Sequence, residues 1–175
     1  MKSKVQAMLL FYGKDILFTK NFDDAFNQVH HGCSSVGYHS IGVALISIYI
    51  AIFLSKIGFE ICMRNVVVAA LCHDLGILGR YEKYKNNREC CSRHPKDSVE
   101  VYKALSEKLQ LSDVDNERVE NAIRRHMFPL TPIPPKYIEG VIINIADKAS
   151  SIFEKVGVSP AIAFHAGMIQ AQKIA

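Results

Sequence analysis

The feature that most limits how this chain can fold is a long apolar run without charged residues, IGVALISIYIAIFL, from Ile41 to Leu54. The run has 14 residues, fewer than the roughly 18 to 20 that span a bilayer. Within the wider segment from Tyr38 to Lys56, apolar residues occupy nearly every face of a helix, which indicates a helix buried on all sides. The sequence therefore predicts a core helix over this segment and no membrane span.

Helical spacing of apolar residues recurs along the rest of the chain. It predicts helices over residues 4–12, 22–29, 65–75 and 136–154, and further helices that begin at His94-Pro95, at Ser112 and at Ser159-Pro160. Asn65 is expected to be an N-cap, and the polar segments 30–35 and 79–93 and the proline-rich segment 129–135 are expected to be connectors. Since no hairpin signal is present, the sequence predicts a single, compact, all-α domain over residues 1–175.

Composition argues against several classes of protein. The net charge is only +4, and no run of five like charges forms a basic tail, so nucleic acid is not an expected partner. Five cysteines without a CxxC pair favour free thiols in a reducing compartment, and therefore a cytoplasmic protein that does not associate with a membrane. The apolar content leaves a homodimer open.

Five polar residues fall where the sequence predicts burial. They are His39, the adjacent pair His73 and Asp74, His126 and Asp147. Taken alone, His39 or His126 would more often be a hydrogen-bonded core histidine, but a buried imidazole or carboxylate without a partner costs on the order of a few kcal/mol. A shared divalent cation would offset that cost at all of these positions together, because it takes imidazole lone pairs and neutralises carboxylates.

The adjacent pair restricts how such a cation could be held. Neighbours on an α-helix point about 100° apart, so His73 and Asp74 can share one ion only near a helix end, or one of them must bind differently. A carboxylate can bridge two ions, whereas a histidine cannot. Gly76 is expected to end the helix just past the pair and to open space for a substrate.

These residues resemble the signature of a known family. His39, His73-Asp74 and Asp147, together with the strings HHGCSS, YHS, CHDLG, RHP, RRHMFPLTPIPP and NIADK, are similar to those of the HD-domain superfamily of metal-dependent phosphohydrolases. The resemblance covers roughly residues 30–155, and it implies a helical HD-domain bundle. It also adds His94 and His126 as the two histidines found in binuclear members.

Carried over to this chain, the resemblance implies a centre of two divalent ions, with Fe, Mn, Mg and Zn all compatible with the ligand types. His39, His73, Asp74 and Asp147 would hold one ion, and Asp74 would bridge to a second ion completed by His94 and His126. A hydroxide on the metals would then attack the phosphorus of a nucleotide or another small phosphoester. The residues expected to hold the phosphorylated substrate are Lys148, Arg80, Arg125, Lys136 and His31.

The chain departs from one branch of that superfamily. Cyclic-dinucleotide phosphodiesterases usually carry a lysine where this chain has Ile77, and they carry a GYP segment that is absent here. The dinucleotide polyphosphate hydrolases are a nearer match. Two alternatives to hydrolysis remain open at this level, a di-iron oxygenase on the same fold and a nucleotide-binding regulatory module without turnover.

Overall fold

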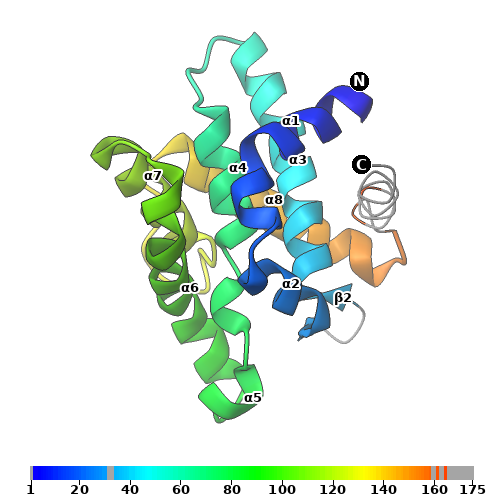
Figure 1. Cartoon of the computed structure of the whole chain (residues 1–175), viewed down its shortest axis with the longest axis vertical. Coiled ribbons are helices and arrows are strands. Elements are labelled where there is room, and N and C mark those ends of the chain that lie inside the picture. Colours follow the sequence, from blue (N-terminus) through cyan, green and yellow to red (C-terminus); the bar gives the residue numbers. More distant parts are fainter. Residues whose placement is uncertain (1, 31–33, 159–160, 162–163, 165–175) are drawn as a thin grey trace.

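The computed structural model describes residues 2–30, 34–158, 161 and 164, and it confirms the predicted all-α class (Figure 1). Its helices follow one another along the chain, with one short two-stranded ribbon between the second and the third. The elements are α1 (Lys2–Leu17), α2 (Lys20–Asn27), β1 (Val29–His30), β2 (Ser34–Ser35), α3 (Val36–Lys56), α4 (Met63–Cys72), the 3-10 helix η1 (Leu75–Ile77), α5 (Arg80–Lys83), α6 (Asn87–Leu109), α7 (Asp113–Arg125) and α8 (Ile138–Lys155).

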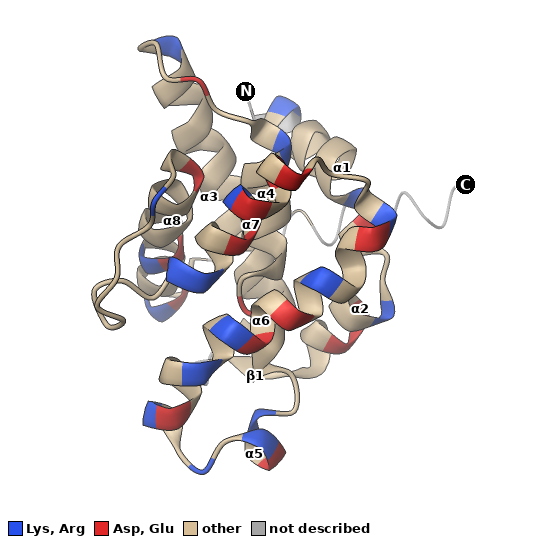
Figure 2. Cartoon of the chain, turned by 90° about the vertical axis from the view of Figure 1, so that its left-hand side faces the viewer, with Lys and Arg blue, Asp and Glu red and all other residues tan. Residues whose placement is uncertain are grey.

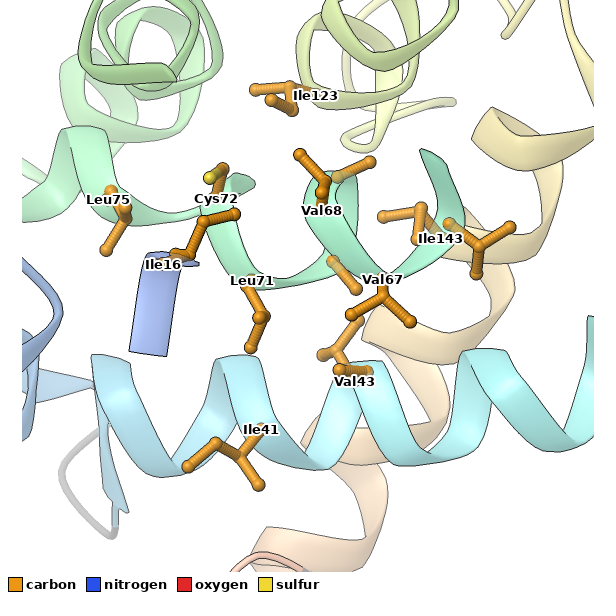
Figure 3. Packing of buried hydrophobic residues seen from close by; sticks show 14 of the residues in the cluster. Ile16, Ile41, Val43, Val67, Val68, Leu71, Cys72, Leu75, Ile123 and Ile143 are labelled. Atoms are coloured by element: carbon orange, nitrogen blue, oxygen red, sulfur yellow. The ribbon is translucent and has the colours of Figure 1, made fainter. Parts of the chain in front are cut away.

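Helix α4 lies at the centre of the apolar core. It packs against α1, α3, α7 and α8, and all its residues from Asn65 to Cys72 are buried. Figure 3 shows Val68 and Leu71 of α4 among Ile41 and Val43 of α3 and Ile123 of α7. Because apolar surface is removed from water on all sides of α4, this packing is the main source of stability that the fold offers.

Helix α3 confirms the predicted core helix and extends it by two residues at its N-terminus, to Val36. By length and composition alone it could also cross a membrane, but 67% of its most apolar window is buried inside the protein. It packs on α4 along one side and on α8 along another. The long apolar run is thus covered mainly by neighbouring helices of the same chain.

Side-chain caps fix where several helices begin. Ser112 Oγ accepts from Asp115 N at the start of α7, where the sequence predicts that a helix begins. The predicted cap at Asn65 is wrong, since α4 begins at Met63 and the Asn65 amide instead donates to Asp115 Oδ1 at 2.6 Å. In the sequence, an asparagine whose buried amide bonds to a neighbouring helix therefore cannot be distinguished from an N-cap asparagine.

The prediction of a loop over residues 79–93 is also wrong, because α5 and the first turns of α6 lie within this segment. Asn86 caps α6 through a bond from Glu89 N, and Glu89 pairs with Arg93 one turn later at 2.8 Å. The polar composition is that of an exposed helical surface, with both signs of charge interspersed along α6 and α7 (Figure 2). Consequently Pro95 lies inside α6 and not in its first turn.

Two smaller expectations need correction at the N-terminal side. α1 is longer at both ends than the helix predicted over 4–12, and α2 begins and ends two residues before the helix predicted over 22–29. The predicted connector 30–35 contains parts of β1 and β2, an antiparallel ribbon that pairs Val29 with Ser35 and His30 with Ser34. Strands of two residues pair through their backbone atoms and are too short for an alternation of apolar and polar side chains, so the sequence does not predict them. The helix predicted from Ser159-Pro160 lies outside the described residues.

Candidate metal centre

The six predicted ligands come from five helical segments and meet at one place. His39 is the fourth residue of α3, His94 lies within α6, His126 is the C-cap of α7 and Asp147 lies within α8. His73 and Asp74 follow α4 directly. All of them except Asp147 are buried, and the side chain of Asp147 is only 14% exposed.

The end of α4 lets two adjacent residues face the same point. Asp74 leaves the helical conformation with φ −111° and ψ 5°, and its Oδ2 lies 3.5 Å from His73 Nε2. The condition set by the sequence, a helix end at this pair, is therefore met.

Gly76 does something other than open space. A Cβ there would lie 2.4 Å from Ser98 N and 2.6 Å from His94 O, both backbone atoms of α6. The expectation that Gly76 ends the helix and leaves room for a substrate is wrong, because α6 fills that room. The missing side chain allows α6, and with it His94, to approach Asp74.

The two oxygens of Asp74 face different histidines. Oδ1 lies 3.2 Å from His94 Nε2 and 3.4 Å from His126 Nε2. Oδ2 lies 3.5 Å from His73 Nε2 and 3.8 Å from His39 Nε2. One carboxylate thus separates two pairs of imidazoles.

Asp147 approaches the pair on the Oδ2 side. Its Oδ1 lies 3.0 Å from His39 Nε2 and 3.9 Å from His73 Nε2. Among the described residues, the sets whose ligand atoms lie close enough to hold an ion are His39, His73 and Asp147; His73, Asp74 and His126; and His30, His39 and Asp74.

Hydrogen bonds on the outer side of the imidazoles set which nitrogen faces inward. Three Nδ1 atoms face carbonyl oxygens, which can only accept, so these nitrogens carry the proton and the Nε2 atoms are left for other partners. The bonds join His73 to Ala70 (2.8 Å), His94 to Cys90 (2.8 Å) and His126 to Ile123 (2.6 Å). His39 is oriented in the same way by Glu154, with Nδ1 2.9 Å from Oε1.

Burial and facing carboxylates act in opposite directions on these imidazoles. Burial alone would lower the pKa of His39, but hydrogen bonds to Asp147 and Glu154 raise it to about 10. Burial also opposes the charged form of His94, and the hydrogen bond to Asp74 raises its pKa to about 10.

The carboxylate of Asp74 is held in its charged form. Burial would raise its pKa, but the electrostatic interaction with His73 and hydrogen bonds from His126 and His94 hold that pKa well below its usual range. His73 itself follows burial, which lowers its pKa to about 4, so its ring is neutral at pH 7.

The inward-facing atoms fit a divalent ion better than they fit one another. The Nε2 of His73 is fully buried and has no hydrogen-bond partner in the described part of the chain. The Nε2 atoms of His94 and His126 face each other at 3.0 Å, a contact in which only one of the two can donate. Imidazoles that give up the proton of Nε2, beside carboxylates, are a donor set for Zn, Fe or Mn.

The residues predicted to hold a substrate differ in their surroundings. Lys148 Nζ donates to His126 O at 3.3 Å and so lies beside the centre. Arg125, half-buried, directly precedes His126 in α7.

The other candidates have partners of their own, or are not described. Arg80 of α5 donates to Asn87 Oδ1 at 2.7 Å. Lys136 pairs with Glu117 at 2.8 Å on the surface, and His31 lies outside the described residues.

Two residues of this site were missed at the level of sequence. His30 belongs to the predicted polar connector 30–35, yet it is 4% exposed and its Nε2 lies 3.6 Å from Asp74 Oδ2. Glu154 is the last residue of the helix predicted over 136–154, yet it is buried and accepts a hydrogen bond from His39. For Glu154 a signal existed, since it lies seven residues after Asp147 and hence on the same face of α8.

Comparison with known proteins adds one finding. A family model described as HD domain matches residues 36–152. The match begins just before His39 and ends two residues before Glu154. No curated protein and no solved structure matches the chain.

Proposed function

This chain belongs to the HD-domain superfamily of metal-dependent phosphohydrolases, and from that premise we propose that it hydrolyses a nucleotide or another small phosphoester with two divalent ions. The observation that carries the proposal is the arrangement of Asp74, which offers Oδ1 to His94 and His126 and Oδ2 to His39 and His73. This arrangement suits a bridging carboxylate, because each oxygen has two imidazoles beside it that could complete the coordination of an ion.

Two ions held in this way would supply Lewis-acid activation of water and charge neutralisation at phosphorus. The residues of the chain then have three tasks. Asp74 and the histidines fix the ions. The carbonyl oxygens behind the imidazoles prevent the rings from turning, and the burial of the cluster excludes bulk water.

Lys148 is the candidate for holding a phosphate oxygen. Its Nζ is part-buried and donates two 3.3 Å bonds, to the carbonyl oxygens of His126 and Asn144. Burial lowers its pKa, but the charge of Asp147 acts against that shift. Arg80 and Arg125 remain further candidates, and a planar guanidinium would bind a phosphate through two hydrogen bonds.

We further propose that the protein is cytoplasmic, because free thiols are typical of a reducing compartment.

The test combines metal analysis with a substrate panel. The purified chain is expected to retain about two metal ions and to release phosphate or nitrophenol from nucleotides or bis-p-nitrophenyl phosphate. Asp74→Ala should lose both properties, whereas Asp24→Ala, at an exposed carboxylate of α2 paired with Lys20, should keep them. Unchanged metal content in Asp74→Ala would contradict the proposal.

The same preparations separate the two alternatives. Oxygen consumption with a mixed-valent iron signal, in place of phosphate release, would indicate a di-iron oxygenase. A nucleotide-dependent rise in melting temperature without turnover would indicate a regulatory binding module.

A further inference from the structure

We propose that His30 is an additional ligand of the ion held by His39 and Asp74, so that the N-terminal ribbon takes part in the metal centre. The inference rests on the proposed centre and extends it. His30 lies six residues before the segment matched by the family model, so the match assigns it no role.

Distances support coordination. Two ligands about 2.1 Å from one ion lie about 3.0 Å apart when they are at right angles and about 4.2 Å apart when they are opposed. His30 Nε2 lies 3.6 Å from Asp74 Oδ2, and His39 Nε2 lies 3.8 Å from the same oxygen. The ligand atoms of these three residues all lie within 4.8 Å of one another, and the three residues are buried.

The ribbon gives His30 a fixed position relative to α3. His30 pairs with Ser34, and Ser35 then caps α3 by accepting from Tyr38 N at 3.3 Å. Val36 N, directly after β2, donates at 2.9 Å to Gln28 O, directly before β1. Backbone bonds thus tie the strand that carries His30 to the first turn of the helix that carries His39.

A role in packing alone is the competing explanation. The rings of His30 and His39 lie with their centroids 4.4 Å apart and their planes tilted by 38°, so His30 also covers one face of His39. The two roles differ in what the Nε2 atom must do, because packing needs the ring and coordination needs the nitrogen.

Coordination by His30 would also change which ions are preferred. With His39 and His73 it would bring three imidazoles to the Oδ2 side of Asp74. Imidazole nitrogen favours iron, cobalt, nickel and zinc, whereas magnesium prefers oxygen ligands. The ion on this side is therefore expected to be a late first-row divalent metal.

The experiment titrates the metal-free full-length chain with Co²⁺ and records stoichiometry, affinity and visible absorption. His30→Phe keeps an aromatic ring against His39 but removes the donor nitrogen, and His30→Ala removes both. Val29→Ala, at the exposed neighbour on the same strand, is the matched control. Both His30 variants are expected to bind one ion at least about 10-fold more weakly, with altered absorption bands, while the control titrates as wild type.

The outcomes separate this inference from the proposed function, because the readout is binding and not turnover. If wild type binds cobalt and His30→Phe shows the same affinity and spectrum, His30 only packs and the inference is overturned. If His30→Ala fails to fold, His30→Phe decides. If wild type binds no ion, the inference and the proposed function fall together.

Discussion

Helix α4 joins two regions of opposite character. From Val66 to Cys72 its side chains are buried among apolar groups of α1, α3, α7 and α8. Immediately afterwards, His73 and Asp74 enter a region just as buried, but built from imidazoles and carboxylates. The first region is stabilised by removing apolar surface from water. In the second, the Nε2 of His73 has no hydrogen-bond partner among the residues that the structure describes.

The difference predicts how each region responds to an ion. A ligand that binds only the native state stabilises it by an amount that grows with the logarithm of the ligand concentration over its dissociation constant. Substitutions in the apolar region should therefore cost the same with and without metal. Substitutions in the histidine cluster should mainly remove the stabilisation that metal provides, and this contrast is what the following variants test.

Asp74→Asn should have the largest effect on the metal-dependent part. The amide keeps the shape of the side chain but loses the charge and cannot offer two equivalent oxygens to two ions. We expect affinity for both ions to fall by more than about 100-fold, which exceeds the effect of losing an outer partner of a ligand. Melting temperature with and without Mn²⁺ measures it. If Mn²⁺ raises the melting temperature of Asp74→Asn as much as that of the wild type, the account is contradicted.

Leu71→Ala tests the apolar region. Leu71 is fully buried in the core around α4, so the variant should lose about 2–5 kcal/mol in the free energy of unfolding. Urea denaturation should give the same loss with and without metal. Phe11→Ala, at a side chain that is 73% exposed, is the matched control and should stay within about 0.5 kcal/mol of wild type. Full recovery on metal addition would break the distinction between the two regions.

Glu154→Gln tests the support behind one ligand. Glu154 accepts from His39 Nδ1 at 2.9 Å and from Ser150 Oγ at 3.1 Å. The glutamine can still accept these bonds but lacks the charge, so metal affinity should fall about 10- to 100-fold. Calorimetric titration of the metal measures the change. Glu60→Gln, at an exposed site between α3 and α4, should bind as wild type, and equal affinity in both variants would show that Glu154 has no part in ligand orientation.

Proton release gives a pH-dependent test of the cluster. In the metal-free protein, carboxylate partners raise the pKa values of His39 and His94 to about 10, against the effect of burial. Their protonation stabilises the fold fully below pH 6.5, and this contribution is lost as the pH rises through about 10. A metal must displace these protons, so binding at pH 8 should release up to about two protons per chain. Calorimetry in buffers of different ionisation enthalpy measures the number, and zero would contradict the account.

Ser112→Ala should give the smallest effect. Ser112 Oγ caps α7 through Asp115 N at 3.2 Å, on the surface. Its loss should cost about 1 kcal/mol in unfolding free energy, with metal affinity unchanged. A large loss of metal binding would mean that His126, at the other end of α7, depends on the whole helix and not on local packing.

The apolar region could largely be predicted from sequence. The run from Ile41 to Leu54 has no charged residue and one stable solution, burial in a helix, and α3 confirms it. The capping serine at Ser112 also carries its own local signal. The loop predicted over 79–93 is wrong because an exposed helix and a loop have similar polar residues. The capping residue Asn86 is the feature that distinguishes the two here.

The histidine cluster could be predicted only in part. His39, His73 and Asp74 stand out because polar groups interrupt apolar helices. His30 could not be recognised, because its burial depends on a two-residue strand whose pairing leaves no pattern in the side chains. The prediction for Gly76 is wrong for a similar reason, since the approach of α6 is a tertiary contact that no local sequence encodes.

The central claim is that the buried polar region is a metal centre arranged about Asp74, and anomalous diffraction from crystals grown with Co²⁺ tests it most directly. Two peaks are expected about 3.5–4 Å apart, one beside the Nε2 atoms of His39 and His73 and the other beside those of His94 and His126. Saturating cobalt without any peak within bonding distance of Asp74 would contradict the account.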